Sequence, residues 1–189
     1  MEFVSATCQA LLVLVFGTAV FGKARSATSF AAFREAVVTL GRVPAARAGA
    51  LAAGIVSAEA VIVVLLAVPW PPGVSLPRSI GLPAAIGLLC SFTFAIVRAR
   101  RGGETVSCRC FGTSAGPLGR VQLLRNALLI AAATAALPGT AHTGHLSWQA
   151  HFAAWLCGFT VALVLVVGDE LAALLRRRPH PVSPAHVNL

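Results

Sequence analysis

The sequence predicts an all-α integral membrane protein, built as a bundle of helices that cross the bilayer. Of its 189 residues, 57% are hydrophobic and only 11% are charged, and the mean hydropathy is +0.83. Soluble domains contain about 25% charged residues, so this composition excludes a water-soluble domain. The chain also contains five apolar runs, each near the roughly 20 residues that a helix needs to cross the hydrocarbon. Little length remains for a large extramembrane enzyme domain.

The five apolar runs are the predicted spans. The first could be read as a signal peptide, but Glu2 and the lack of a basic residue before the apolar core favour a retained helix. Pro83 in the third run fits a helix only near its start. The expected core, residues 1–137, holds four spans, an extra span follows, and residues 169–189 form a basic, Pro-rich, disordered cytoplasmic tail. The predicted spans are residues 3–22, 48–68, 80–97, 121–137 and 148–168.

A short surface helix is predicted between the first two spans, at residues 28–40. Its apolar residues recur at about helical spacing, and Gly41 and Pro44 end the run. Charged residues occupy its other faces. This pattern is typical of a helix that lies on the membrane surface, here the cytoplasmic one.

The basic residues alternate between connections in a way that predicts orientation. Thirteen lie in the connections after the first and third spans and in the tail, whereas only Arg78 lies on the opposite side and Arg125 falls inside the fourth span. Cytoplasmic loops of membrane proteins are enriched in Lys and Arg, so the N-terminus is expected outside and the C-terminus in the cytoplasm. The formal charge of +9 is therefore mainly an orientation signal, and nucleic acid is not an expected partner.

Two cysteines one residue apart, Cys108 and Cys110, stand in the basic loop before the fourth span. A bridge between them requires a tight turn and would be strained, and strained, exposed disulfides are the readily exchanged ones. Neighbouring arginines would favour the reactive thiolates. The plainer alternative is two reduced, idle thiols, as a reducing compartment would keep them.

A metal site is not expected. His142, His145 and His151 fall on the outer side of the membrane, and two cysteines alone are too few for a closed zinc site. The remaining cysteines lie within spans and are expected to act as small apolar packing residues. They are Cys8, Cys90 and Cys157.

Three polar residues inside spans form a second candidate site: Glu59 in the second span, and Arg125 and Asn126 in the fourth. Burying a charge at the bilayer centre costs at least about 2.5–3.5 kcal/mol, so such residues should face protein and find partners. Small residues recur every fourth position beside them, which favours close packing of the two spans. We therefore expect Glu59 to pair with Arg125 or to accept a hydrogen bond from Asn126. The stripes are Ala46, Ala50, Gly54 and Ala58, and Ala127, Ala131 and Ala135.

In these features the chain resembles the MauE family of methylamine-utilisation proteins, within the DoxX-like group of four-helix membrane proteins. The resemblance covers roughly residues 5–137 and depends most on Cys108, Cys110, Phe111 and Gly112. The weaker features that accompany this motif are Gly22-Lys23, the surface helix through Phe33-Arg34, Glu59 and Arg125-Asn126.

The resemblance implies a factor that works with a thioredoxin-like partner to mature the disulfide-rich small subunit of methylamine dehydrogenase. Cys108 and Cys110 would then exchange electrons as thiols, accessory to a thiol–disulfide oxidoreductase. Two alternatives stay open. One is a non-catalytic membrane scaffold, and the other is a small-solute or quinone-binding subunit centred on Glu59, for which a quinone would be the cofactor. Assembly into an oligomer is compatible with each.

Overall fold

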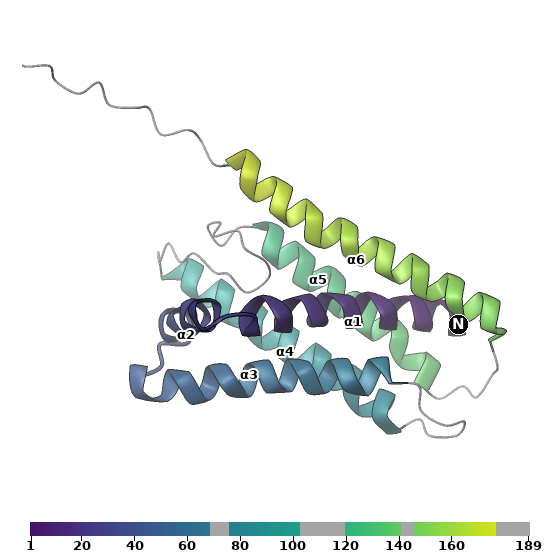
Figure 1. Ribbon diagram of the computed structural model, residues 1–189, viewed down its shortest axis with the longest axis horizontal. Helices are drawn as coiled ribbons and strands as arrows, with labels where there is room; N and C mark the ends of the chain where they lie inside the picture. The colour runs from purple at the N-terminus through teal and green to yellow at the C-terminus, as the bar shows by residue number, and fades with distance from the viewer. Residues whose placement is uncertain (69–75, 103–119, 141–145, 177–189) are drawn as a thin grey trace, which may run out of the picture.

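The computed structural model describes residues 1–68, 76–102, 120–140 and 146–176, all within or next to helices. Figure 1 shows long helices lying side by side, with one short helix across an end of the bundle. Along the chain the elements are α1 (Glu2–Ala24), α2 (Ala27–Gly41), α3 (Ala45–Ala67), α4 (Leu76–Arg101), α5 (Arg120–Ala136), a 3-10 turn η1 (Leu137–Thr140) and α6 (Trp148–Arg176).

The predicted fold class is confirmed. Five helices are long and apolar enough to cross a membrane, and no strand occurs in the described ranges. Successive spans run in opposite directions (Figure 1). Large apolar side chains cover the outside of the bundle, as expected where lipid replaces water. Among these exposed side chains are Val61, Val64, Phe94, Leu128, Leu156 and Val164.

Two helices are longer than the sequence predicts. α4 begins at Leu76, so Pro83 lies inside the helix rather than near its start. A proline there removes one backbone hydrogen bond within the helix. α6 continues to Arg176, so residues 169–176, which we expected in the tail, extend the last helix. The remainder of the expected tail lies outside the described residues.

The predicted short helix is present as α2, and its ends have clear local causes. Ser26 caps the start, because its hydroxyl accepts a hydrogen bond from the Ser29 amide at 3.1 Å. At the other end Arg42 adopts a left-handed backbone with φ of 50°. This conformation stops the helix, and Pro44 then precedes α3. In Figure 1 α2 is seen nearly end-on while α1 and α3 run across the view, so it crosses their direction.

α1 is the central helix of the bundle and packs against α2, α3, α5 and α6. Its buried residues Leu12, Val15 and Phe16 belong to the main apolar core, together with side chains from α3, α4, α5 and α6. Two hydrogen bonds join α1 to neighbouring backbones near its start. The Ser5 hydroxyl donates to the Ala136 carbonyl at 3.0 Å, and the Gln9 amide donates to the Leu66 carbonyl. Such side chains satisfy carbonyls at helix ends, where water is absent.

α6 docks on α1 through small side chains. Ala154 and Ala162 are fully buried, and Gly158 lies between them one helical turn from each. A Cβ atom at Gly158 would meet the Thr7 carbonyl oxygen and would lie 2.7 Å from the Ala10 Cβ. The two backbones are therefore as close as only glycine permits, which is how small residues join helices in membranes.

The two stripes of small residues predicted to pack spans two and four together face outward instead. Ala46, Ala50, Gly54 and Ala58 are all exposed on α3, and no atom lies within 4 Å of the place where a Gly54 Cβ would be. The second stripe, on α5, is equally exposed. α3 packs on α1, α2 and α4, and its buried residues are Ala48, Ala52, Glu59, Ile62 and Leu66. The prediction that these stripes join α3 to α5 was wrong, because small residues can also lie against lipid.

The charge separation used to predict orientation is present in three dimensions. Seven exposed arginines lie at the end of the bundle where α2 is found, whereas Arg78 lies at the opposite end, in the first turn of α4. The seven are Arg25, Arg34, Arg42, Arg47, Arg98, Arg100 and Arg101. We call the end of the bundle that holds α2 and these seven arginines the α2 end.

Replacing Gly158 with Val should loosen the α1–α6 contact, because the new side chain would strike backbone atoms of α1. Overpacking of this kind costs about 1–3 kcal/mol. Thermal unfolding of the purified chain in detergent would measure the loss. Gly54→Val is the matched control, since the same substitution there meets open space and should change the midpoint little. Equal losses in both variants would contradict the α6 docking described here.

A buried ion pair as the candidate functional site

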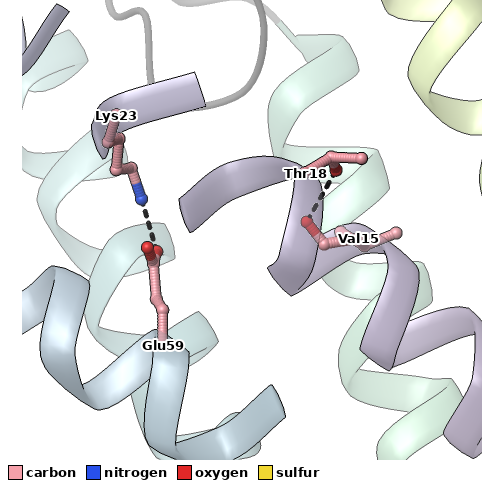
Figure 2. Close-up of polar contacts among 4 residues, drawn as sticks. All are labelled: Val15, Thr18, Lys23 and Glu59. Carbon is pink, nitrogen blue, oxygen red and sulfur yellow. Dashed lines mark hydrogen bonds and ion pairs between the residues drawn. The ribbon is translucent and has the colours of Figure 1, made fainter. Parts of the chain in front are cut away.

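The polar centre of the bundle is an ion pair between Lys23 and Glu59. Lys23 belongs to the last turn of α1, and Glu59 lies near the middle of α3. The Lys23 ammonium donates a hydrogen bond to Glu59 Oε1, and the two side chains are 1% and 0% exposed (Figure 2). Glu59 lies 14 residues after the start of α3, which corresponds to about 21 Å of helix. The partners meet because α3 extends past the end of α1 on the side where α2 lies (Figure 1).

Two aromatic rings also lie beside the Lys23 ammonium. The Nζ atom lies 4.7 Å from the centre of the Phe33 ring on α2 and 5.3 Å from that of the Phe92 ring on α4. Both distances are within the range of a cation–π interaction, which is strongest where water is excluded. Phe33 also belongs to a small second core with Val37 and residues of α3. α2 therefore covers the ion pair and is held over it by its own apolar contacts.

Glu59 uses only one of its two oxygens in this contact. The second oxygen, Oε2, is buried and has no hydrogen-bond partner in the part of the chain that the structure describes. A carboxylate in an apolar interior normally has both oxygens satisfied. We had expected Glu59 to pair with Arg125 or to accept from Asn126. That prediction was wrong, because the charge paired with Glu59 is Lys23, which donates to Oε1, while Oε2 accepts from neither residue of α5.

Arg125 nevertheless lies close to this centre, and Asn126 is the next residue of α5. Both are buried on α5, and the Arg125 charge is near enough to repel the Lys23 ammonium. The Asn126 amide donates to the Thr93 hydroxyl on α4 at 3.3 Å, and Thr93 follows Phe92 in the chain. The Asn126 carbonyl oxygen is a second buried acceptor with no partner among the described residues. α5 thus adds one cation and one amide to the site.

Lys23 is the residue whose role the sequence did not reveal. It appeared only as a weak family feature at the end of the first span, and it was counted among the basic residues of the connection that follows. One signal was available: Lys23 is the only lysine among 15 basic residues. A flexible ammonium can reach into a bundle and pair with a carboxylate as a point charge, whereas a guanidinium is larger and planar.

Four of the other predicted site residues belong to the cysteine motif. Cys108, Cys110, Phe111 and Gly112 lie outside the described residues. In the described ranges, no three His, Cys, Asp or Glu side chains come together as a metal would require. Figure 2 also draws Thr18, whose hydroxyl donates at 2.9 Å to the Val15 carbonyl of its own helix. That bond is local to α1.

The chemistry open to this arrangement follows from its burial. A charged pair can persist away from water only if each partner compensates the other, since removing either leaves an isolated charge. The same surroundings make a neutral amine and a neutral acid accessible forms of the pair, because burial disfavours charge. The site can therefore stabilise the bundle, and it can also hold or release a proton.

Comparison with known protein families matches residues 1–139 to the family described as "Methylamine utilisation protein MauE". The match includes α1 to α5 and the whole polar centre, and α6 lies beyond it. No curated protein and no solved structure matches the chain.

Replacing Glu59 with Met should destabilise the protein strongly, because the Lys23 ammonium would lose its carboxylate. Losing one partner of a buried pair costs about 3–5 kcal/mol. The double variant Lys23→Met/Glu59→Met should be more stable than Glu59→Met alone, since it leaves no unpaired charge between these positions. Unfolding of each purified variant would measure the difference. Glu35→Met, at an exposed carboxylate on α2, is the control and should be nearly neutral. Simple addition of the two single losses would contradict the pairing.

Proposed function

Because the chain belongs to the MauE family, we propose that it is a membrane factor for thiol–disulfide exchange, linked to methylamine metabolism. The observation that carries this proposal is the sequence Cys108-Arg109-Cys110-Phe111-Gly112, which lies within the matched residues 1–139. The end of α4 and the start of α5, between which this motif occurs in the sequence, lie at the α2 end of the bundle (Figure 1). The buried ion pair lies at the same end, where Phe33 of α2 covers the Lys23 ammonium.

The proposed reaction is exchange between the Cys108–Cys110 pair and a dithiol or disulfide of a thioredoxin-like protein. A thiolate attacks one sulfur of the opposing disulfide, and a mixed disulfide forms and is then resolved by the second thiol. In total two electrons and two protons pass from the pair that becomes a disulfide to the pair that becomes a dithiol. Nearby arginines support this chemistry, because positive charge favours the attacking thiolate.

The proposed orientation places the N-terminus outside and the α2 end in the cytoplasm. It is supported by the arginines gathered at the α2 end, since cytoplasmic loops carry the excess of basic residues. Cys108 and Cys110 would then meet a partner in the cytoplasm. Maturing a disulfide-rich enzyme outside would in that case require a further electron carrier across the membrane, because structural disulfides form in oxidising compartments.

A second candidate function is a quinone-binding or small-solute-binding subunit centred on Glu59. The observation that favours it is the buried Oε2 atom, which has no partner among the described residues. An unpaired buried acceptor is costly and is a natural contact for a donor on a ligand. A purely structural role for the pair, as in a scaffold, does not explain why Oε2 has no partner among the described residues.

Trapping the cysteines by rapid acidification and alkylation should reveal a reversible disulfide between Cys108 and Cys110. Cys108→Ser and Cys110→Ser should each abolish it, because each removes one sulfur. Cys90→Ser is the control, since Cys90 is an exposed residue in the middle of α4 and should leave the bond intact. Mass spectrometry of the alkylated peptides measures the oxidised fraction. Cysteines that stay fully reduced under oxidising and reducing conditions alike would refute the exchange role.

A membrane-impermeant maleimide should fail to label Cys108 in intact cells and should label it after the membrane is opened. The expectation follows from the distribution of basic residues. The experiment uses variants that retain a single cysteine. A cysteine introduced beside Arg78, at the opposite end of the bundle, should behave in the reverse way. Labelling of Cys108 from outside would overturn the orientation and place the exchange with periplasmic partners.

A further inference from the structure

We propose that Lys23 and Glu59 form an intramembrane proton-exchange site, in which one proton moves between Lys23 Nζ and the Glu59 carboxylate. The inference rests on the contacts of this pair and does not depend on thiol exchange at the cysteines. It assigns a chemical role to the buried carboxylate of α3.

The first step is the contact itself. Lys23 Nζ already donates its proton toward Glu59 Oε1 within a hydrogen bond. Transfer breaks one N–H bond and forms one O–H bond, and it converts an ammonium and a carboxylate into an amine and a carboxylic acid. No electron changes hands and the net charge of the pair stays the same. With exposures of 1% and 0%, the pair has no water shell to hold it in the charged form.

The second step concerns the groups that face the pair. From α5, the Arg125 guanidinium repels the Lys23 ammonium and therefore favours transfer, and it stays charged itself. From α2 and α4, the rings of Phe33 and Phe92 attract the ammonium and oppose transfer. Thr93 and Asn126 are neutral and hydrogen-bond each other. The groups around the pair thus act in opposite directions on the position of the proton. A purely structural ion pair would not require this balance.

The third step is the open acceptor on the far side of the carboxyl group. Glu59 Oε2 is buried and has no partner in the described ranges, so the carboxyl group can take the Lys23 proton on Oε1 without losing a hydrogen bond at its other oxygen. A structural clamp would satisfy both oxygens, because an unsatisfied buried acceptor costs free energy.

The experiment uses the full chain in phosphatidylcholine vesicles and the apolar reagent dicyclohexylcarbodiimide, which modifies neutral carboxylic acids and not carboxylates. We expect modification of Glu59, located by mass spectrometry, and none at that position in Glu59→Gln. Lys23→Met should be modified faster, because the isolated carboxyl group becomes a neutral acid. Arg125→Gln should be modified several-fold more slowly, since loss of the repulsion keeps the proton on Lys23. Glu35→Gln, at an exposed carboxylate, should leave the rate at Glu59 unchanged.

The two roles of the pair give different results. If Glu59 in the unaltered chain stays unmodified while Lys23→Met is modified, the reagent reaches the site and the carboxyl is permanently ionised, which overturns the proposal. If neither is modified, infrared spectra of the unaltered chain and Glu59→Gln decide. A carboxylic acid carbonyl band that is lost in Glu59→Gln supports the exchange site, and the absence of such a difference overturns it. Neither result bears on the disulfide between Cys108 and Cys110.

Discussion

The arrangement of the first five helices depends on one contact, the ion pair between Lys23 and Glu59. Away from water neither charge is tolerable alone, so the position of each helix that carries one is tied to the other. α1 must end close to the middle of α3, and the chain after Lys23 must therefore turn aside. The turn is made at Ser26, where α2 begins, and Phe33 of α2 returns to the Lys23 ammonium. Burying the pair and placing α2 are in this sense a single structural requirement.

The bilayer explains why the polar groups of the bundle behave as they do. In hydrocarbon every exposed backbone donor or acceptor is costly, so side chains such as Ser5 and Gln9 are used to satisfy carbonyls at the ends of neighbouring helices. Against this background, the exceptions among the buried atoms of the described residues include one oxygen each of Glu59 and Asn126, and the indole nitrogen of Trp155 on α6. Glu59 and Asn126 both lie within the residues matched to the family, whereas Trp155 does not.

Most of the fold could be predicted from the sequence, because the membrane allows few solutions to a run of about 20 apolar residues. The spans, the short helix α2 and the burial of Glu59, Arg125 and Asn126 all follow from composition and spacing. Which helices touch could not be predicted in the same way. A stripe such as Ala50-Gly54-Ala58 fits a neighbouring helix and lipid equally well, and the stripe that does pack, around Gly158, looks no different in the sequence.

The partner of Glu59 was missed for a related reason. Hydropathy assigns Lys23 to a helix end, where a long side chain usually reaches the surface. Only the relative heights of α1 and α3 show that it points inward. This offset between the two helices along the bundle axis depends on how far each helix is inserted into the membrane, and a single sequence carries no direct measure of that. The cysteine motif has the opposite character, since its chemistry can be read from its residues while its surroundings lie outside the described structure.

The close approach of α6 to α1 also has a consequence for the order of assembly. α1 is made before α6, so the surface of α1 around Ala10 and Leu11 is uncovered while the four helices between them are being synthesised. The ion pair, by contrast, joins residues only 36 positions apart and can close as soon as α3 has been inserted. The ion pair can therefore form early in biogenesis, and α6 then packs on a bundle whose polar centre is already in place.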